Sequence, residues 1–470
     1  MMTALFWFRQ DLRCDDNAAL AAACNRHNLL IPLYIDSDNP QRLCGAAQKW
    51  WLHHSLLALN NYLCTQNTRL CLKQGNPLDV LMQLIKQHQV THIYWNECIE
   101  PELRKEEQQI KSILQQNGIQ IETYPPNLFF TPAKIHTQQQ TIFKRFTPFW
   151  RYCLQHLAPH PPAVIKKWPA CPAFSSEQLD DWHLLPAKPD WASNFKDYWQ
   201  PGEQGAQEKL QQFIEDELAA YDKNRDLPAR QATSRLSPHL HFGEISPWRI
   251  WQELEKIKFD SAYSHSAIEK FLAELGWREF SYYTLYHYPA LPHSNIQKTF
   301  DEFKWKTNKV YLQAWHKGQT GFPIVDAGMR ELWQTGYMHN RVRMITASFL
   351  TKNLLIDWRT GAAWFEDTLL DADLAANSFN WQWVAGSGMD AAPYFRIFNP
   401  VLQGEKFDSS GEYVKKWVPE LTSLPVKWLH KPWQMPAQPG FILGKNYPSP
   451  IINLTQTRIR ALAAYRELKK

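Results

Sequence analysis

The sequence predicts an N-terminal α/β domain with a doubly wound parallel sheet, followed by an all-α C-terminal domain. Three observations support this prediction. Short apolar runs alternate with helical periodicity over the first 130 residues. Prolines then crowd residues 125–206, and helical periodicity fills almost all of the chain that remains. We therefore expect an α/β domain over 1–130, a long connector over 131–206 and a helical domain over 207–470.

The short apolar runs of the N-terminal region indicate buried strands, and the segments between them have helical spacing. The expected strands are residues 4–9, 29–35, 69–75, 92–97 and 119–124. The expected helices are residues 17–27, 46–65, 77–89 and 103–117. The turn after the first strand reads FRQDLRCDDN, without the glycines of a dinucleotide-binding fingerprint, and the chain has no Walker A loop. If this sheet binds a ligand, we expect it to do so without a glycine-rich cradle.

The region after the connector is helical in pattern and contains no convincing strand. Its expected helices are residues 207–222, 247–257, 265–287, 322–336, 340–356, 359–371 and 455–468. We therefore expect the second domain to be built from helices alone.

Composition excludes several classes of protein. The chain is 44% apolar and 21% charged, which is typical of folded globular proteins. It has no apolar run of about 18 residues, and Arg9 and Asp11 come too early for a signal peptide, so we expect a cytoplasmic protein. The eight cysteines include no C-x-x-C pair, which argues against an iron–sulfur cluster, a thiolate zinc site and a disulfide framework. No metal is expected.

Tryptophan and charge are unevenly distributed along the chain. Of the 22 tryptophans, 13 follow residue 247; most are expected to be buried anchors, and composition does not identify any that stack on a ligand or carry electrons. Residues 1–220 hold 20 Lys+Arg and 22 Asp+Glu, a net charge of −2, whereas residues 221–470 hold 31 and 24, a net charge of +7. A basic, aromatic-rich half favours a nucleic acid partner, although a mildly basic solvated surface has the same composition.

The segment ATSRLSPHLHFGEIS (232–246) combines hydroxyl groups with a guanidinium. The residues concerned are Thr233, Ser234, Arg235 and Ser237. They suit a diphosphate clasp where a helix begins, and helix capping alone is the alternative. His239 and His241, with Glu244, resemble metal ligands, but two histidines two residues apart do not share a helical face, which disfavours a metal site.

Two further segments carry groups suited to a planar ligand. In FLAELGWREFSYY (271–283), Glu274, Trp277 and Arg278 share one helical face, with a Glu274–Arg278 ion pair as the ordinary alternative. In MHNRVRM (338–344), Asn340 and Met344 share a face. The segment LLDADLAANSFNWQWVAGSGMDAAPYFRIFNP then concentrates Asp371, Asp373, Asn377, Trp381 and Trp383.

Several segments together match one family. They are TSRLSPHLHFG, WREF, MHNRVRM, DADLAAN, WQW and DAAPYFRIFNPVLQGEKFD, and the opening FWFRQDLRCDDNAAL fits the same pattern. In this order they closely resemble the photolyase/cryptochrome family, specifically class I photolyases that repair cyclobutane pyrimidine dimers. The resemblance spans essentially the whole chain and is densest over 221–410. It implies an antenna domain, a connector and a helical domain that binds FAD non-covalently.

The resemblance implies residues that hold the FAD. They are Tyr221, Thr233, Ser234, Arg235, Leu236, Ser237, Phe271, Glu274, Arg278, Arg343, Asp371, Asp373 and Asn377. Tyr221 and the segment 233–237 would hold the diphosphate, and Arg343 and Asp371 resemble the ion pair beside the isoalloxazine. Asn377 resembles the amide that faces flavin N5, which is associated with a stable reduced flavin.

The resemblance also implies that the partner is UV-damaged DNA, bound by a monomer. The implied catalytic residues are Glu274, Asn340, Met344 and Asn377, and the implied DNA-binding residues are Arg225, Trp277, Arg278, Asn340, Arg341, Trp383, Arg396 and Gln403. A dimer pairs poorly, so flipping it out of the helix costs less than flipping a normal base. In the implied reaction, excited reduced FAD donates an electron to the dimer, the cyclobutane bonds split and the electron returns. Trp381, Trp358 and Trp305 match the family's relay, which photoreduces oxidised flavin.

Departures from the family pattern and alternative functions stay open. Ser378-Phe379-Asn380 stands where Asn-Gly-Gly or Asn-Gly-Asn is common, and Phe271 stands where an indole is common, so flavin tuning or packing can differ. The alternatives are a cryptochrome-like blue-light photoreceptor, a (6-4) photoproduct photolyase and a flavin-binding structural DNA protein. The chain ends soon after its last expected helix, which disfavours a cryptochrome. Asn340 and Met344 replace the two histidines that a (6-4) photolyase requires.

The expected antenna chromophore is 5,10-methenyltetrahydrofolate. Glu100, in YWNECIEP (94–101), matches a glutamate that binds the pterin in the folate-binding branch, and a carboxylate is a good acceptor for pterin N–H groups. His293 stands where that branch can carry a lysine, and Asn96-Glu97-Cys98 differs from the usual aromatic-rich stretch. A deazaflavin or an empty site is the alternative.

Overall fold

The computed structural model describes residues 3–37, 44–158, 161–437 and 439–468. The chain forms two compact units. Unit 1 comprises Met1–Asp190, Trp199–Ala219 and Ser234–Pro289, and unit 2 comprises Trp191–Tyr198, Ala220–Thr233 and Ala290–Lys470. Unit 1 thus takes in parts of the expected connector and of the expected helical region, and the expected domain limits stay a prediction.

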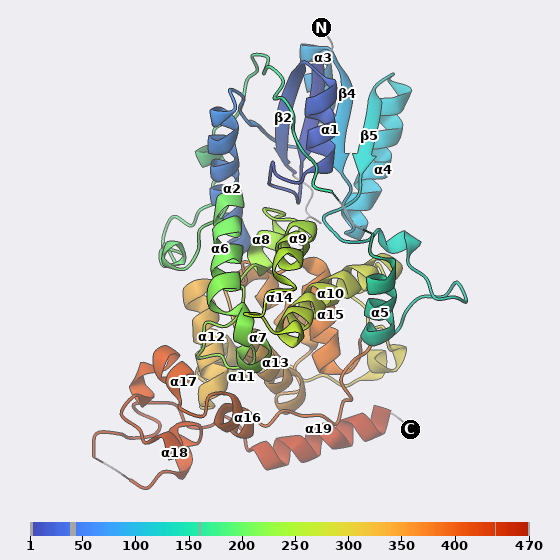
Figure 1. Ribbon diagram of the computed structural model, residues 1–470. Coiled ribbons are helices and arrows are strands. Elements are labelled where there is room, and N and C mark those ends of the chain that lie inside the picture. The colour runs from blue at the N-terminus through green and yellow to red at the C-terminus, as the bar shows by residue number, and fades with distance from the viewer. Residues whose placement is uncertain (1–2, 38–43, 159–160, 438, 469–470) are drawn as a thin grey trace. The chain divides into compact units, whose positions relative to one another are not determined.

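Unit 1 contains the expected parallel sheet (Figure 1). Its strands are β1 (Thr3–Phe8), β2 (Leu29–Asp36), β3 (Cys71–Gln74), β4 (Val90–Asn96) and β5 (Gln120–Tyr124). The order β3-β2-β1-β4-β5 places the reversal of winding between β1 and β4. Leu5 pairs with Ile31 on one side and with Ile93 on the other. All three side chains are fully buried, so the centre of the sheet is the core of this region.

The helices between the strands lie within two residues of the predicted bounds. They are α1 (Ala18–Arg26), α2 (Ala46–Thr65), α3 (Pro77–His88) and α4 (Pro101–Gln116). α1 packs against β1, β4 and β5, whereas α3 and α4 contact each other and pack against β4 and β5. Right-handed crossovers place α1 on one face of the sheet and α3 and α4 on the other. The Asn17 side chain starts α1 by accepting the Leu20 amide at 3.1 Å.

Further helices complete unit 1. They are α5 (Phe146–His156), α6 (Glu203–Asp216), α8 (Ser237–His241), α9 (Pro247–Ile257) and α10 (His265–His287). α9 and α10 have the predicted bounds because serines cap both: Ser246 accepts the Arg249 amide at 2.8 Å and Ser264 accepts the Ala267 amide at 3.4 Å. The prediction missed α5, which lies within the proline-rich stretch. It also placed α6 too late and extended it too far.

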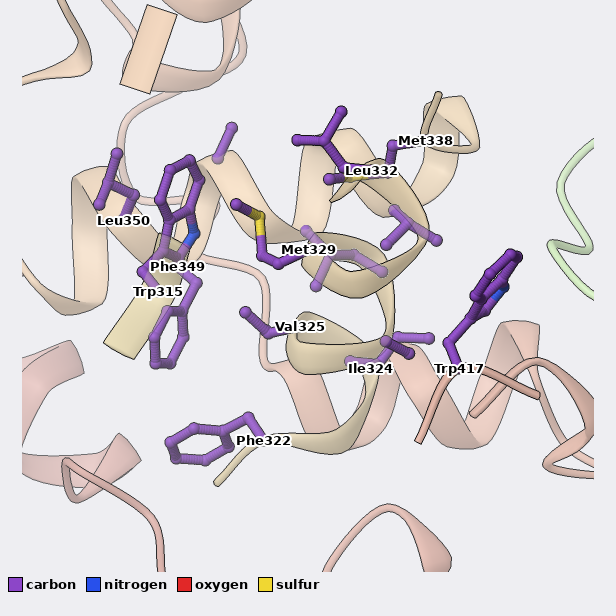
Figure 2. Close-up of a cluster of buried hydrophobic side chains, with 14 of the residues drawn as sticks. Trp315, Phe322, Ile324, Val325, Met329, Leu332, Met338, Phe349, Leu350 and Trp417 are labelled. Carbon is purple, nitrogen blue, oxygen red and sulfur yellow. The ribbon is translucent and has the colours of Figure 1, made fainter. Parts of the chain in front are cut away.

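Unit 2 is helical, and its described residues contain no strand, in agreement with the prediction. Its α-helices are α7 (Tyr221–Asn224), α11 (Lys309–His316), α12 (Pro323–Thr335), α13 (Asn340–Ser348), α14 (Trp358–Thr368), α15 (Leu374–Ala385), α16 (Pro400–Phe407), α17 (Glu412–Trp417), α18 (Val426–Leu429) and α19 (Leu454–Leu468). The core surrounds α12, where Val325, Met329 and Leu332 meet Trp315 and Phe349 (Figure 2).

Short 3-10 helices occur at Pro132–Lys134, Leu179–Trp182, Phe195–Asp197, Leu218–Ala220, Lys298–Glu302, Pro419–Leu421 and Pro432–Gln434. Within the described ranges, no helix is both long and apolar enough to cross a membrane.

Three departures from prediction occur in the part of unit 2 that carries most of the predicted site. The expected helix over 340–356 ends as α13 at Ser348, and the chain continues as a π-helix over Phe349–Asn353. The expected helix over 359–371 ends at Thr368. α15 was not predicted, although its start is capped by Asp373 and its end is followed by Gly386 at φ 92°.

Candidate functional site

An ion pair in unit 2 joins α13 to the turn that follows α14. Arg343 donates to both oxygens of Asp371, with Nη1–Oδ1 at 3.0 Å and Nη2–Oδ2 at 2.9 Å. Its Nε donates to the carbonyl of Met338 at 2.6 Å. Burial lowers the pKa of Arg343, but the Asp371 carboxylate outweighs burial and the net pKa is raised. A bidentate pair of this kind fixes the plane of the guanidinium.

The Asn377 side chain on α15 is oriented by α14. Its Nδ2 donates to the carbonyl of Ala362 at 3.0 Å and to Glu366 Oε2 at 3.1 Å. Both partners are acceptors, so the network assigns the amide orientation. Oδ1 has no hydrogen-bond partner within the described ranges, and the residue is half-buried. The side chain therefore presents an acceptor oxygen.

Asp373 lies between the ion pair and this amide in the sequence. Its Oδ1 accepts the Ala376 amide at 2.8 Å, and its own amide donates to the carbonyl of Asp371 at 2.7 Å. Asp373 is thus the N-cap of α15 and links the turn that holds Asp371 to the helix that holds Asn377. This local geometry places the three predicted flavin contacts on one continuous segment.

The three predicted relay tryptophans share one apolar cluster of unit 2. Trp358 and Trp381 are buried members of the cluster, and Trp305 is partly buried and packs against the cluster. The Trp381 indole lies so close to α14 that a Cβ added at Gly361, three residues after Trp358, would be 2.1 Å from it. The residue after Trp305 donates its amide to the carbonyl of Leu355 at 2.7 Å, three residues before Trp358. The partly exposed Trp305 and the buried Trp358 and Trp381 therefore belong to one packed region of unit 2.

α13 presents two predicted lesion contacts on one face. Asn340 is exposed and Met344 is half-buried, and a spacing of four residues places them one turn apart. His339 caps the helix: burial lowers the pKa of His339 to about 4, so its neutral Nδ1 accepts the Arg341 amide at 3.2 Å.

Asp226, which is outside the predicted set of site residues, connects two predicted DNA-binding arginines. Asp226 Oδ1 lies 2.9 Å from Arg341 Nη2 and 3.9 Å from Arg225 Nε. The Arg341 guanidinium also lies 4.5 Å above the Phe407 ring, and that of Arg225 lies 5.4 Å from the Tyr221 ring. One carboxylate therefore holds two cations close together. The sequence signal was an aspartate directly after Arg225 in NRDLP.

Other predicted contacts of unit 2 lie at or near its surface. Arg396 is exposed, and its guanidinium has no partner among the residues that the structure describes. Gln403 is half-buried on α16, and Thr233 is half-buried ahead of the boundary between the units. Trp383 is half-buried on α15 and packs against the same apolar cluster as Trp381.

The predicted residues of unit 1 include the Glu274 and Trp277 face of α10, and both side chains are half-buried. Trp277 stacks on Phe146 of α5, with ring centroids 3.7 Å apart and planes 9° apart. Phe271, three residues before Glu274, is buried against Phe213 at a centroid distance of 4.6 Å. Phe271 thus packs in the interior of unit 1.

Arg278 has several partners within unit 1. Its terminal nitrogens donate to the carbonyl of Asn127 at 2.9 Å and to that of Leu240 at 3.4 Å. Its guanidinium also lies 4.9 Å from the Tyr282 ring. These contacts tie α10 to two other segments, so much of its hydrogen-bonding capacity is already in use.

The Ser234–Ser237 segment of unit 1 is a tight turn. Arg235 has φ 53°, in the left-handed region, and its guanidinium lies 4.4 Å above the Trp199 ring. Ser234 Oγ accepts the Leu236 amide at 3.4 Å, and Ser237 is exposed at the start of α8. The turn therefore presents polar groups at the surface of this segment.

The histidines that follow do not form a metal site. His239 Nδ1 lies 2.5 Å from Glu244 Oε2, and both side chains are buried. Glu244 Oε1 also accepts from Trp51 Nε1 at 3.0 Å and from the Gly202 amide at 2.7 Å. Within the described ranges no group of three or more His, Cys, Asp and Glu side chains could hold a metal ion. Glu244 is therefore a structural acceptor.

Glu100 lies where the chain passes from β4 into α4. Its Oε1 accepts from Gln10 Nε2 at 2.7 Å. Gln10, together with Asp11 after β1 and Asn96 at the end of β4, lines a pocket at the reversal point of the sheet. The full lining is Gln10, Asp11, Asn96, Glu97, Cys98, Ile99, Pro126, Asn127, Leu128, His241, Arg278 and Tyr282. Doubly wound sheets commonly bind ligands at this position. Glu100 is not part of the lining and is connected to it through its hydrogen bond with Gln10.

Comparison with known proteins adds independent findings. The family model described as DNA photolyase matches residues 4–170, and the one described as FAD binding domain of DNA photolyase matches residues 271–467. Deoxyribodipyrimidine photo-lyase of Agrobacterium fabrum is 46% identical over 99% of this chain and 98% of that protein. Cryptochrome-2 of Arabidopsis thaliana is 34% identical over 98% of this chain and 79% of that protein.

Solved structures are similar over the same length. A bacterial class III photolyase from Agrobacterium tumefaciens has a TM-score of 0.97 and 46% identity, covering 100% of this chain and 98% of that one. An archaeal photolyase from Sulfolobus tokodaii, solved with two FAD molecules, has a TM-score of 0.84 and 30% identity, covering 99% and 100%. These similarities confirm the predicted fold class and the expectation of a photo-lyase-type enzyme, and the domain match supports FAD.

Proposed function

Because the chain belongs to the photolyase/cryptochrome family, we propose that it is a DNA repair enzyme that uses light to split cyclobutane pyrimidine dimers. One observation carries this proposal. The nine-residue helix α13 bears both Arg343, paired with Asp371, and the accessible Asn340–Met344 face. The first group suits a flavin and the second suits a lesion, so one short helix would position the electron donor and its acceptor.

The residues near the ion pair fit a reduced flavin. Arg343 offers a fixed cation, and Asn377 offers an acceptor oxygen where the reduced ring has an N–H donor. Ala362 and Glu366 hold the amide so that its oxygen, and not its NH2 group, is presented. Reduced FAD supplies the light-driven electron when bound, and the protein positions and tunes it.

The remaining flavin contacts are proposed from the family pattern. Tyr221 and the segment from Thr233 to Ser237 would hold the diphosphate, and Asp373 would reach the flavin edge. Arg278 already donates to two carbonyls, so its proposed contribution is to hold α10 in place. Phe271, a buried residue of α10, would act through its packing against Phe213.

From the family pattern, the dimer is proposed to contact Glu274, Trp277, Asn340, Met344 and Trp383. The two indoles offer apolar faces to a flipped lesion, and Glu274 offers a hydrogen bond to the pyrimidine edge. Repair of a (6-4) product requires proton transfer by an acid–base pair. An amide and a thioether do not serve in this role, which favours the cyclobutane dimer as substrate.

The DNA backbone is proposed to contact Arg225, Arg341, Arg396 and Gln403. Phosphate contacts by arginine supply affinity without reading sequence, which suits a lesion that occurs in any context. The net charge of +7 over residues 221–470 agrees with such a partner. Asp226 would keep Arg225 and Arg341 close together before DNA arrives.

Trp381, Trp358 and Trp305 are proposed to carry an electron from the surface to oxidised FAD. Their membership of one packed cluster, with Trp305 at the partly exposed end, supports this order. The relay would restore the reduced flavin and would take no part in repair itself.

We propose class III membership in place of the class I expectation, because the class III photolyase from Agrobacterium tumefaciens has a TM-score of 0.97. For the antenna we retain 5,10-methenyltetrahydrofolate at Glu100, with Gln10 orienting the carboxylate. A flavin is the alternative, because the Sulfolobus tokodaii photolyase holds two FAD molecules. Folate-sensitised energy transfer that is lost in Glu100→Ala and kept in the exposed control Glu102→Ala would support folate; equal transfer in both would refute the assignment.

A cryptochrome-like photoreceptor is the second candidate, favoured by the 34% identity with Cryptochrome-2. A cytoplasmic, monomeric enzyme stays our expectation for location and assembly. The test is illumination of the reduced holoenzyme with DNA that carries either cyclobutane dimers or (6-4) products, with a dark control. We expect loss of the cyclobutane dimers in light only. Repair of (6-4) products at a comparable rate, or no repair of either lesion, would refute the proposal.

A further inference from the structure

Lys352 is a buried cation in the π-helix of unit 2. Its residue is 1% exposed, and Nζ donates to the carbonyl of Tyr394 at 3.0 Å and to that of Arg396 at 3.5 Å. The same Nζ lies 4.7 Å from the centroid of the Tyr394 ring. No carboxylate within the described ranges forms an ion pair with it. All of its polar contacts therefore go to one loop.

This arrangement is costly for folding. An ammonium buried without a carboxylate loses its hydration, and backbone carbonyls replace only part of it. Burial, with a smaller effect from Arg396, lowers the pKa of Lys352 to about 7. An apolar side chain of similar length would fill the space without this cost. The contacts of the lysine therefore point to a role in fixing the loop.

The loop is anchored twice from the same helical stretch. Ser348, at the end of α13, accepts the Phe398 amide on Oγ at 3.3 Å, and Lys352 holds the carbonyls of Tyr394 and Arg396. Asn340, Met344, Ser348 and Lys352 recur every four residues. The row that begins with the proposed lesion contacts thus continues into the anchors of the loop.

The anchored loop separates an inward side chain from two outward ones. Tyr394 is buried and stacks on Tyr465 of α19, with centroids 4.6 Å apart and planes 13° apart. The Arg396 amide donates to the carbonyl of Pro393 at 2.9 Å, which closes a turn. Phe395, 64% exposed, and the exposed Arg396 lie within this turn.

We propose that Lys352 is a positioning residue for DNA recognition, which fixes the turn at 393–396 so that Arg396 and Phe395 are presented to damaged DNA. This inference rests on the proposed function, because it takes DNA as the partner of Arg396. Lys352 itself touches neither DNA nor flavin. Its contribution is to reduce the number of conformations that the turn samples before binding.

The experiment is a double-mutant cycle on affinity for a dimer-containing duplex, measured in the dark with FAD-loaded protein. Lys352→Met should weaken binding about threefold, while the flavin content and the melting temperature stay at or above the wild-type values. Arg396→Ala should weaken binding directly and by a larger factor. If Lys352 acts through the turn, adding Lys352→Met to Arg396→Ala should cost much less than threefold.

Contrasting results separate this inference from the proposed function. Unchanged affinity in Lys352→Met, or full additivity with Arg396→Ala, would overturn the inference alone. A wild-type protein that does not prefer the dimer duplex over undamaged DNA would overturn both. If Lys352→Met does not fold, Ser348→Ala removes the second anchor and should weaken binding by a smaller factor. Unchanged affinity there would count against the anchored turn.

Discussion

Polar groups in the two units differ in how fully their hydrogen-bonding capacity is used. In unit 1, the buried Asp11 carboxylate accepts from the Arg9 amide at 2.7 Å and from the side chains of Asn17 and Asn96 at 3.1 and 2.5 Å. In unit 2, the Asn377 oxygen has no partner within the described ranges, and the exposed Arg396 guanidinium has none there either. The unit 1 groups satisfy one another's hydrogen bonds, whereas the unit 2 groups keep hydrogen-bonding capacity for a partner.

Structural and functional polar groups in this molecule differ in whether their hydrogen-bonding capacity is fully used. A satisfied buried network fixes the fold, and its loss costs stability. A half-buried group that neighbours orient but do not satisfy costs little for folding and is available to a ligand. The Arg343–Asp371 pair is intermediate between these two kinds of group. Its charges are paired with each other, but the Arg343 guanidinium is still partly exposed.

The largest effect is expected from breaking the Arg343–Asp371 ion pair. Asp371→Ala leaves the largely buried Arg343 without its carboxylate, and removal of one partner of a buried pair costs about 3–5 kcal/mol. We expect a lower melting temperature and loss of bound FAD, measured by calorimetry and by the flavin-to-protein absorbance ratio. Glu122→Ala is the matched control, because its pair with Arg26 is exposed and worth at most about 1 kcal/mol. Equal effects of the two changes would contradict the distinction.

Lys352→Met also tests the difference between structural and functional polar groups, but here the variant is not expected to lose stability. Replacing the buried cation by an apolar chain removes the cost of its lost hydration, so the melting temperature should stay at or above the wild-type value. The pKa of Lys352 is about 7 in the folded chain against a usual 10.5. Between these values the unfolded chain holds a proton that the folded chain has lost, so wild-type stability should rise with pH across this window. Urea unfolding at the two ends of the window should show this rise reduced in the variant; an unchanged rise would exclude Lys352 as its source.

Trp305→Phe separates a relay from a packing anchor. Loss of the outer indole should slow photoreduction of oxidised FAD by about tenfold or more, equivalent to about 1.4 kcal/mol in the barrier. Repair by enzyme reduced beforehand should change little, because the relay feeds the flavin and lies outside the repair path. Absorbance during illumination measures the first activity, and dimer loss measures the second. Parallel loss of both would identify Trp305 as a structural anchor.

Arg396→Ala gives the smallest expected effect. Loss of one phosphate contact should weaken binding by about 1 kcal/mol on dimer-containing and undamaged DNA alike, and should reduce the salt slope by about 1. Titrations at several salt concentrations measure both quantities. The exposed Lys256, paired with Glu253, provides a control of equal charge change. If Lys256→Ala has the same effect, the contribution is net charge alone.

The sheet of unit 1 was predictable because its elements are local. Strand runs such as 29–35 are apolar throughout, and caps such as Asn17 mark the helix starts. The five strands and four helices of the N-terminal region accordingly lie within three residues of the predicted bounds. The family resemblance led to Arg343 and Asp371 as a pair, and the structure contains that pair.

The rest of the site depends on contacts between distant segments. Asp226 and Glu366 contact side chains 115 and 11 residues away in the chain, and Lys352 contacts a backbone carbonyl 42 residues away, which no local periodicity encodes. We did not predict α15 because its polar and aromatic residues were assigned to a ligand-binding motif. Asp373 and Gly386 are nevertheless ordinary start and stop signals of a helix. The π-helix was missed because an apolar run such as FLTKNLL fits a continuous helix equally well.

The groups left unsatisfied in unit 2 are proposed to serve a catalytic cycle. The most direct test counts the cyclobutane dimers split per protein molecule under continuous blue light, starting from reduced holoenzyme with excess damaged DNA. We expect many dimers split per molecule, none in darkness, and no net consumption of reduced flavin, because the electron returns after each event. No splitting in light, or fewer than one dimer per molecule with the flavin left oxidised, would contradict it.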